Sequence, residues 1–383
     1  MSKRSTKRAR GFTLMEMVVA TALGTVVVAS ATQLYVQGVS ATWTVSQKAE
    51  MQQDFRAASN MLTKDLSLAG AGLGNGAAIQ LPTSSTIPVY GCDQSSTCYI
   101  IGASVKYPQL GSTPFLYGLL TGYNLGPTLY AAQGATDIVT VAYTDPSFYL
   151  DCYTASIAST TTVTFALPST TSTNCTANGA TIQNINDAAV GLTPGDLVLF
   201  TFTAGSSTIP VVAEVYGATP SSTTVTFASG DPLKMNQGSS EPKSLANEYS
   251  STTTVTGYGV RLLVITYYID NTVTPPRLMR QISGHSPMPV AESTVYLKFT
   301  YDLFNSSTNA IATQCQNPGA STDVCYSGSS SGLLPNNITK INIANLAMDS
   351  SVKGSLYGLS KGDQSIDLQT SVSARNLTYV NNY

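Results

Sequence analysis

The stretch GFTLMEMVVATALGTVVVASATQLYV, residues 11–36, decides what the rest of the chain can be. Between Met17 and Val36 there is no charged residue, and such a helix, rising about 1.5 Å per residue, spans a hydrocarbon core roughly 30 Å thick. The segment ahead of it is basic, with Lys3, Arg4, Lys7, Arg8 and Arg10, and the next charged residue after it is Lys48. We therefore expect one membrane-inserted helix whose basic start stays in the cytoplasm.

One acidic residue, Glu16, lies inside the apolar run, four residues after Phe12. A lone carboxylate costs about 2.5 kcal/mol or more near the centre of a bilayer, and less near its edge. An acid in this position predicts a partner that carries positive charge.

The string Gly11-Phe12-Thr13-Leu14-Met15-Glu16 follows a short basic leader and precedes an apolar helix. It resembles the processing site of the type IV pilin superfamily. The resemblance implies that a prepilin peptidase cuts between Gly11 and Phe12, that Phe12 is then N-methylated, and that Glu16 is needed for assembly with other pilins. The chemistry is coherent, because a carboxylate one helical turn away, or on a neighbouring subunit, can neutralise the new amine.

Two simpler interpretations compete with this one. An ordinary signal peptide also has a basic start and an apolar middle, and Ala29-Ser30-Ala31 fits a small-x-small cleavage site. A plain single-pass anchor is the other alternative, but it requires neither the Gly11-Phe12 pair nor Glu16.

Composition favours a β-rich extracytoplasmic protein over a cytosolic enzyme. Only 10% of the 383 residues are charged, and Glu, Lys and Arg, which favour helices, are scarce beyond residue 66. Without the five basic residues of the leader the chain keeps 14 basic and 21 acidic residues, a net charge of about −7. An acidic surface argues against a general electrostatic grip on nucleic acid, so no nucleic-acid partner is predicted.

The six cysteines fall into pairs that are close in sequence. The simplest set joins Cys92 to Cys98, Cys152 to Cys175 and Cys315 to Cys325, although 15 connectivities exist in principle. Each bridge would stabilise a polar loop by about 2 to 4 kcal/mol and needs an oxidising compartment. A metal site is the weaker alternative, because the chain has no Cys-x-x-Cys pair and a single histidine.

The apolar helix is expected to continue as an amphipathic helix to about residue 68. Apolar residues recur there on one stripe, at Met51, Phe55, Ala58, Leu62 and Leu66. The charged residues of this half balance to zero and are interpreted as a solvated face: Lys48, Glu50, Asp54, Arg56, Lys64 and Asp65. Repeated glycines in residues 69–74 predict its end.

Strands are expected to dominate from residue 137 onwards. Alternating or apolar runs predict strands at 137–143, 161–167, 196–202, 211–216, 223–228, 260–270, 277–281, 290–301, 338–348 and 366–377. The last two are expected to close the sheet near the C-terminus. Residues 159–166 nearly repeat as 221–228, which indicates two similar strands rather than a solenoid. Residues 75–135 are expected to form long loops with short strands.

Several segments narrow the resemblance to PilW-like minor pilins. They are residues 50–74 at the helix exit, Gly195–Leu199, residues 260–303 and Ser365–Leu377. The likeness covers the helix and the second half of the chain, and leaves residues 75–190 and the cysteine loops flanking residues 314–327 uncovered.

No catalytic pattern emerges from the chain. The sequence has no phosphate-binding glycine loop, no Gly-x-Ser-x-Gly elbow and no zinc motif. The single histidine, His285, lies in a loop and is interpreted as solvated surface. We expect no enzyme activity, no cofactor and no metal. Trp43 and Tyr35 are expected to lie near the membrane surface.

These observations predict an α+β protein of type IV pilin-like fold, with a helix over about 14–68 packed on a large, mostly antiparallel head. The expected segments are a removed leader (1–11), a transmembrane and assembly half-helix (12–36), an amphipathic half-helix (37–70) and a β-rich head (71–383). The resemblance implies a structural minor pilin, cut and methylated by the prepilin peptidase, held in the bacterial inner membrane and then placed in the initiating or tip complex of a type IV pilus, where it supports pilus assembly. A type II secretion pseudopilin and an adhesin-type head with an unknown surface ligand are the alternatives.

Overall fold

The computed structural model describes residues 12–74, 78–82, 109–110, 113–145, 148, 150–166, 185–204, 207–217, 220–221, 223–305, 308–318, 323–325, 334–349 and 365–378. The chain divides into two compact units. The first contains the helix up to Gln52, and the second contains Gln53–Asp349 and Ser365–Tyr383.

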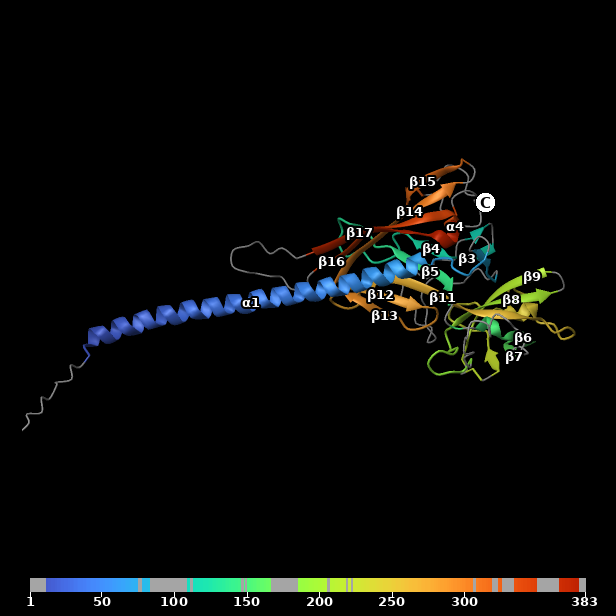
Figure 1. Cartoon of the computed structure of the whole chain (residues 1–383), viewed down its shortest axis with the longest axis horizontal. Helices are drawn as coiled ribbons and strands as arrows, with labels where there is room; N and C mark the ends of the chain where they lie inside the picture. The colour runs from blue at the N-terminus through green and yellow to red at the C-terminus, as the bar shows by residue number, and fades with distance from the viewer. Residues whose placement is uncertain are drawn as a thin grey trace, which may run out of the picture. The chain divides into compact units, whose positions relative to one another are not determined.

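The first element is one α-helix, α1, from Leu14 to Ser67 (Figure 1). It ends one residue before the predicted limit, at the glycine run. Gly70, Gly72 and Gly74 all have positive φ angles, which L side chains rarely adopt, so the helix cannot continue through them. Past the helix end, Gly70 N donates to Ala142 O at 2.9 Å and Thr144 N donates to Ala71 O at 2.9 Å.

The predicted apolar stripe of α1 is buried. Ala58, Leu62 and Leu66 are fully covered, and Met51 and Phe55 are nearly so. On the opposite face Gln52, Gln53, Arg56 and Asn60 are exposed. The amphipathic pattern therefore identified the face that the helix buries.

The head is organised around β11 (Thr256–Asp270), a strand of 15 residues with different neighbours along its two halves. Its second half lies between β5 (Ile138–Thr144) and β12 (Arg277–Ile282), both antiparallel to it. Beyond them, β4 (Leu119–Gly122) pairs with β5, and β13 (Met288–Glu292) pairs with β12.

The first half of β11 pairs with β8 (Leu197–Ala204), which pairs in turn with β9 (Ser207–Glu214). The first residues of β11 also pair with β6 (Thr154–Ser159). β6 pairs in turn with β7 (Thr162–Ala166), and β7 pairs with β10 (Thr224–Thr226). The two near-repeats of the sequence thus become neighbours, because β7 and β10 pair antiparallel with Val163 opposite Val225.

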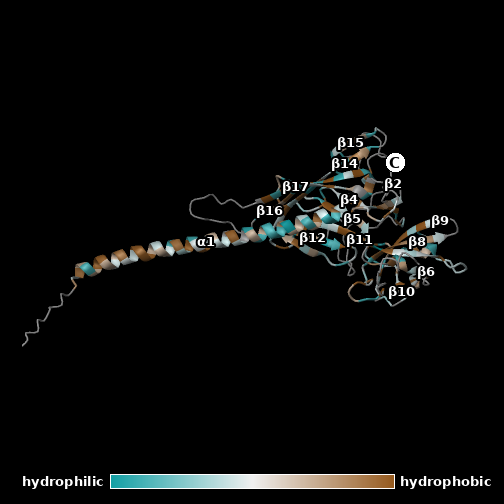
Figure 2. Cartoon of the chain, viewed as in Figure 1, coloured by the Kyte–Doolittle hydropathy of each residue, from teal (hydrophilic) through white to brown (hydrophobic). Residues whose placement is uncertain are grey.

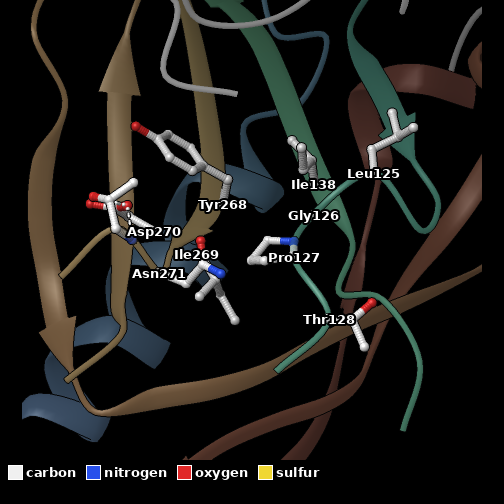
Figure 3. Close-up of a pocket in the computed structure, with 10 residues that line it drawn as sticks. Leu125, Gly126, Pro127, Thr128, Ile138, Tyr268, Ile269, Asp270 and Asn271 are labelled. Carbon is white, nitrogen blue, oxygen red and sulfur yellow. Dashed lines mark hydrogen bonds between the residues drawn. The ribbon is translucent and has the colours of Figure 1, made fainter. Parts of the chain in front are cut away.

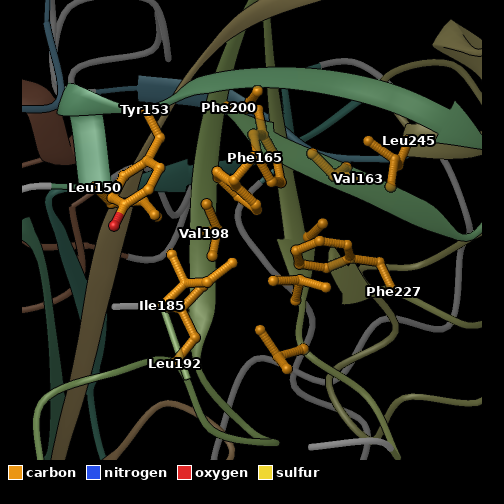
Figure 4. Close-up of a cluster of buried hydrophobic side chains, with 14 of the residues drawn as sticks. Leu150, Tyr153, Val163, Phe165, Ile185, Leu192, Val198, Phe200, Phe227 and Leu245 are labelled. Atoms are coloured by element: carbon orange, nitrogen blue, oxygen red, sulfur yellow. The ribbon is translucent and has the colours of Figure 1, made fainter. Parts of the chain in front are cut away.

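This half of the sheet has its own aromatic core (Figure 4). Phe200 lies at its centre, stacked on Phe202 with ring centroids 5.1 Å apart and edge-on to Phe227 at 5.3 Å. Offset and edge-to-face pairs of this kind add about 0.5–1.5 kcal/mol each beyond burial. The core explains why the Phe-rich runs at 163–165, 198–202 and 225–227 form strands.

A separate sheet has the strand order β15-β14-β16-β17. Its strands are β14 (Thr294–Asn305), β15 (Ala310–Cys315), β16 (Ile338–Asp349) and β17 (Ser365–Ser373). A small sheet contains β1 (Ala78–Gln80), β3 (Thr113–Tyr117) and β2 (Gln109–Leu110). The described residues also include the short helices η2 (Leu150–Cys152), α3 (Leu245–Glu248), η4 (Pro335–Asn337) and α4 (Arg375–Thr378).

The α+β prediction is confirmed, with a long N-terminal helix and sheets whose described strand pairs are antiparallel. Three details differ from the predicted strands. The run 290–301 is broken at Ser293, whose φ of 56° ends β13 before β14 begins. The run 366–377 leaves the sheet after Ser373 and turns into α4. The last two strands pair within the β14 sheet and do not close the β11 sheet.

Candidate functional site

The N-terminal end of α1 is closed by a reciprocal pair of side chains. Thr13 Oγ1 accepts from Glu16 N at 3.3 Å, while the Glu16 carboxylate accepts from Thr13 N at 3.0 Å and from Thr13 Oγ1 at 3.1 Å. This is a capping box, which satisfies amide groups that the first helical turn leaves without partners. The box turns the Glu16 carboxylate back along the chain, towards Phe12.

The geometry brings the predicted site residues Phe12 and Glu16 to one end of one helix. The carboxylate contacts the amide of Thr13, which is one residue away from the nitrogen that a cut before Phe12 would release. Phe12 itself is 87% exposed. Gly11, the other residue of the predicted cut, lies outside the described residues.

The first unit presents an apolar helical surface that no part of the described chain covers. Nothing in the most apolar stretch of α1 is buried, and large side chains from Leu14 to Val45 are at least 39% exposed. Figure 2 shows the brown of apolar residues along this part of the helix. Among the described residues α1 is the one helix long and apolar enough to cross a membrane. Trp43 and Tyr35 are exposed on it, at 66% and 73%.

The described cysteines are in disulfides. Cys315 is joined to Cys325, and Cys152 is also disulfide-bonded. Cys92, Cys98 and Cys175 lie outside the described residues. Asp323 lies beside the Cys315–Cys325 bridge, but it accepts from the amides of Gln316 and Cys325, so it serves to hold the loop.

A buried polar cluster links the last turn of α1 to strands of the head. Asp65 Oδ2 accepts from Tyr267 Oη at 2.6 Å and from Arg280 Nε at 2.8 Å, and Asp65 Oδ1 accepts from Tyr143 Oη at 3.2 Å. The Asp65 side chain is only 3% exposed and that of Arg280 15%. These partners come from β5, β11 and β12, three adjacent strands.

The electrostatics of this cluster keep Tyr143 and Tyr267 protonated and Arg280 charged. Burial and the negative charge of Asp65 raise the pKa of both Tyr143 and Tyr267, so their hydroxyls remain donors. Burial disfavours the charge of Arg280, but the hydrogen bond and the charge of Asp65 outweigh it and raise the pKa of Arg280. The buried charge of Asp65 is tolerated here because it is paired with Arg280 and accepts three hydrogen bonds.

The interpretation of Asp65 as part of a solvated face is wrong. Asp65 follows Ala58 by seven residues and Leu62 by three, so it shares the face of the apolar stripe. Counting the charges of this half-helix, which sum to zero, could not reveal that Asp65 is buried. The helical spacing from Ala58 and Leu62 predicts that Asp65 lies on the buried face.

The head also holds a pair formed by a histidine and an aspartate, His285 and Asp196. His285, expected to be solvated, is half-buried, and its Nε2 lies 2.9 Å from Asp196 Oδ1. Asp196 also accepts from Thr193 N at 2.7 Å. The hydrogen bond between His285 and Asp196 connects the loop after β12 to the start of β8 and fixes the position of the histidine.

A hollow of about 300 Å³ lies at the end of β11, against the loop that precedes β5 (Figure 3). Its walls are mostly apolar or backbone, with Pro127, Ile138 and Tyr268 among them. Asp270 Oδ1 accepts from Thr272 N and Oγ1, at 2.9 and 2.7 Å, so it stabilises the turn that follows the strand. The hollow brings together no acid–base pair among its described residues.

Comparison with known families gives one match. Residues 6–32 match the family described as the prokaryotic N-terminal methylation motif. No curated protein and no solved structure matches the chain. The match covers the helix start that carries Phe12 and Glu16, and it supports a type IV pilin-like or pseudopilin-like substrate of the prepilin peptidase.

Proposed function

We propose that this chain is a PilW-like minor pilin, a structural subunit that the prepilin peptidase cuts between Gly11 and Phe12. The methylation motif over residues 6–32 is the premise. The observation that carries the proposal is the exposed, uncharged helix surface that begins with the Thr13–Glu16 capping box. The subunit is N-methylated on Phe12, held in the inner membrane with its head outside the cytoplasm, and then incorporated into a type IV pilus.

The exposed half of α1 supports this role because it needs an apolar environment. A continuous apolar surface of this length in water would cause aggregation. Lipid covers it before assembly, and helices of neighbouring pilins cover it afterwards. Gly38 adds a notch between Tyr35 and Trp43, where a neighbouring side chain can pack.

Glu16 supports the assembly step. Its carboxylate is already turned towards the chain start by the capping box, so the amine released at Phe12 meets it in the same subunit or in the next one. Opposite charges within about 4 Å in a low-dielectric environment attract strongly, which offsets the cost of removing both from water.

The head favours a place at the end of the fibre. About 300 residues form a body with a radius of gyration of roughly 19 Å, whereas helices in a packed core lie about 8–10 Å apart. A subunit with few neighbours accommodates such a head, as in an initiating or tip complex.

The decisive experiment replaces Glu16 by Ala in cells that make the fibre. Processing should continue, because the cut lies before Phe12, while the amount of the subunit in sheared fibres should fall at least about tenfold. Glu50→Ala, at an exposed position of the same helix, is the matched control and should be incorporated normally. Normal incorporation of the Glu16 variant would refute the assembly role.

Mass spectrometry of the mature N-terminus tests the processing step. Methyl-Phe12 supports the proposal, whereas Thr32 as first residue identifies a signal peptide cut after Ala31, and an intact start identifies a plain anchor. Deletion of the gene assigns the machine: loss of surface fibres supports a pilus, and loss of protein secretion with normal fibres supports a type II secretion pseudopilus.

A further inference from the structure

A second, more polar hollow of about 570 Å³ lies over the sheet that contains β14 and β16. We call it the polar hollow. Its principal side chains are those of Tyr123, Asn124, Gln133, Tyr296, Lys298 and Asn345. Its volume falls within the range of about 300–1,000 Å³ that small-molecule sites occupy.

The floor of the polar hollow is a face of β14 and β16, whose pairing shifts register between Thr294 and Tyr296 and between Lys298 and Phe299. Tyr296, Lys298 and Thr300 alternate along β14, so their side chains project from the same side of the sheet. Asn345 of β16 is paired directly with Lys298 across the ladder. Strands hold such groups more rigidly than loops do, which favours a preformed site.

The wall is the segment between β4 and β5, and it is tied to the floor. Tyr296 Oη donates to Gln133 O at 2.9 Å, and Asp137 N donates to Leu297 O at 2.9 Å. Lys298 Nζ lies 4.8 Å from the centroid of the Tyr123 ring. These contacts fix the width of the hollow.

The charge inside the polar hollow is already neutralised. Lys298 Nζ donates to Asp137 Oδ1 at 2.8 Å and also to Asn124 Oδ1. The Asp137 side chain is 3% exposed and is further held by Phe299 N at 3.0 Å and Asn124 N at 2.8 Å. Lys298 is the one cation among the described lining residues, so an anion would find no free positive charge.

The rim is rich in amides. Asn124, Gln133, Gln316 and Asn345 each offer both donors and an acceptor, as a sugar hydroxyl does. The Oδ1 atom of Asn345 is buried and has no hydrogen-bond partner among the described residues. Leaving such an acceptor unpaired costs about 1–3 kcal/mol, and rotation of the amide about χ2 would turn it to a ligand hydroxyl.

Other ligand classes fit this chemistry less well. An apolar ligand would bury the amides without partners, which is unfavourable. The described lining holds no nucleophile with an adjacent base and no pair of carboxylates, so binding rather than catalysis is favoured. The rings of Tyr123 and Tyr296 supply flat surfaces on which the C–H faces of a sugar can stack.

We propose that the polar hollow binds a short neutral oligosaccharide, with the amides of Gln133, Gln316 and Asn345 bonding its hydroxyls and Tyr123 stacking on a ring. The head is then a glycan-binding module as well as a fibre subunit. This proposal does not depend on the assembly role of α1, because every residue that carries it lies in the second unit.

The experiment measures binding by the full-length chain in a detergent without a sugar head group. The neutral probes are cellotriose, chitotriose, maltotriose and mannotriose, and the anionic competitors are sialyllactose and a sulfated disaccharide. Binding is measured by saturation-transfer NMR. Each sugar is added up to about 10 mM, so that a site with a Kd near 1 mM is still detected. We expect saturable binding of at least one neutral trisaccharide and no preference for the anions.

Gln133→Ala and Gln316→Ala should each weaken that binding about tenfold. Gln369→Ala, an exposed glutamine on β17 of the same sheet and outside the hollow, is the matched control and should bind normally. Tyr123→Leu tests stacking and should also weaken binding. All variants should enter fibres normally, which separates this test from that of Glu16.

Three outcomes would overturn the proposal: no saturable binding of any neutral trisaccharide, tighter binding of the anionic sugars, or binding that the hollow variants leave unchanged. Failure of incorporation with intact sugar binding would count against the assembly role alone.

Discussion

The carboxylate of Asp65 holds three side chains from three strands, at a position where the helix is fully covered. Removing its charge would leave Arg280 buried without a counter-ion, and two tyrosine hydroxyls with a weaker acceptor. Breaking a buried pair in this way typically costs about 3–5 kcal/mol.

We therefore predict that Asp65→Asn lowers the free energy of unfolding by about 3 kcal/mol, measured by urea unfolding in detergent. Glu50→Gln makes the same chemical change at an exposed position of α1 and should alter stability by less than about 0.5 kcal/mol. Equal stability of the two variants would show that the cluster does not hold the helix.

A buried pair of acids, Asp231 and Glu214, is expected to contribute to the pH dependence of stability. Asp231 and Glu214 are fully buried and bonded to each other, which requires a proton between them. Burial raises the pKa of Asp231, although the hydrogen bond from Glu214 and the amides of Met235 and Asn236 oppose the rise. The folded chain therefore keeps the proton to a higher pH than the unfolded chain.

Proton linkage gives the direction in which stability changes with pH. The stabilisation is complete below the pKa of an unfolded aspartate, about 3.9, and is lost as pH rises through the higher folded pKa. We predict that Glu214→Gln, whose amide is a permanent donor, weakens this decline in melting temperature between acid and neutral pH. Asp367→Asn, an exposed acid on β17, should leave the profile unchanged. A Glu214→Gln profile that matches the unmodified chain would contradict the shared proton.

At the scale of elements, the end of α1 depends on close packing against β5. Gly72 has a φ of 75°, and a Cβ there would lie 1.9 Å from Thr144 Oγ1. Gly74 has a similar φ of 81° but no atom within 4 Å of its Cβ position. The two glycines thus have similar backbone conformations, but only Gly74 has room for a Cβ atom.

We predict that Gly74→Ala costs about 1–2 kcal/mol, for the backbone conformation alone, and that Gly72→Ala costs about 3 kcal/mol or more. Chemical unfolding of both variants measures the difference. Thr144→Ala should recover part of the Gly72→Ala loss, because it removes the closest atom. Equal losses at the two glycines would show that the contact with Thr144 relaxes freely.

The elements best predicted from sequence are those with a regular apolar pattern over many residues. The helix was predicted to within one residue because its apolar stripe and its glycine stop are local signals. β6 and β15 were missed because Thr154–Ser159 and Ala310–Cys315 have little apolar alternation; β6 forms by pairing with β7 and β11, and β15 with β14. Ser293 was missed because a single left-handed residue leaves no mark on hydrophobic periodicity.

The candidate sites divide in the same way. Phe12 and Glu16 could be singled out because the motif that contains them is contiguous in the sequence, and their roles stay predictions. Arg280 and Tyr143 meet Asp65 from 215 and 78 residues away in the chain, so no local pattern could assemble the cluster. The polar hollow is built from four separate segments, namely the β4–β5 segment, β14, the residue after β15 and β16, so no local pattern could predict it either.

At the scale of the whole molecule, the two units have opposite solvent requirements. The exposed apolar residues of α1 end at Val45, except for Met61, and the second unit has a buried core of its own. A chain without residues 1–45 should therefore need no detergent.

We predict that this shortened chain sediments as a monomer in buffer and melts within about 4 °C of the full chain. A chain shortened only by residues 1–11 keeps the apolar surface and should still require detergent. Aggregation of the first truncation would mean that the head carries an apolar surface that the described residues do not reveal.

The Asp65 cluster has a mechanical consequence. In the proposed fibre, tension would load the subunit along the axis of α1, and the load would pass to the head through the buried side chains of the helix. At Asp65 it divides among three hydrogen-bonded strands, β5, β11 and β12, which share the shear instead of peeling apart one bond after another. We therefore expect this contact between the last turn of α1 and the sheet to resist tension along the helix axis.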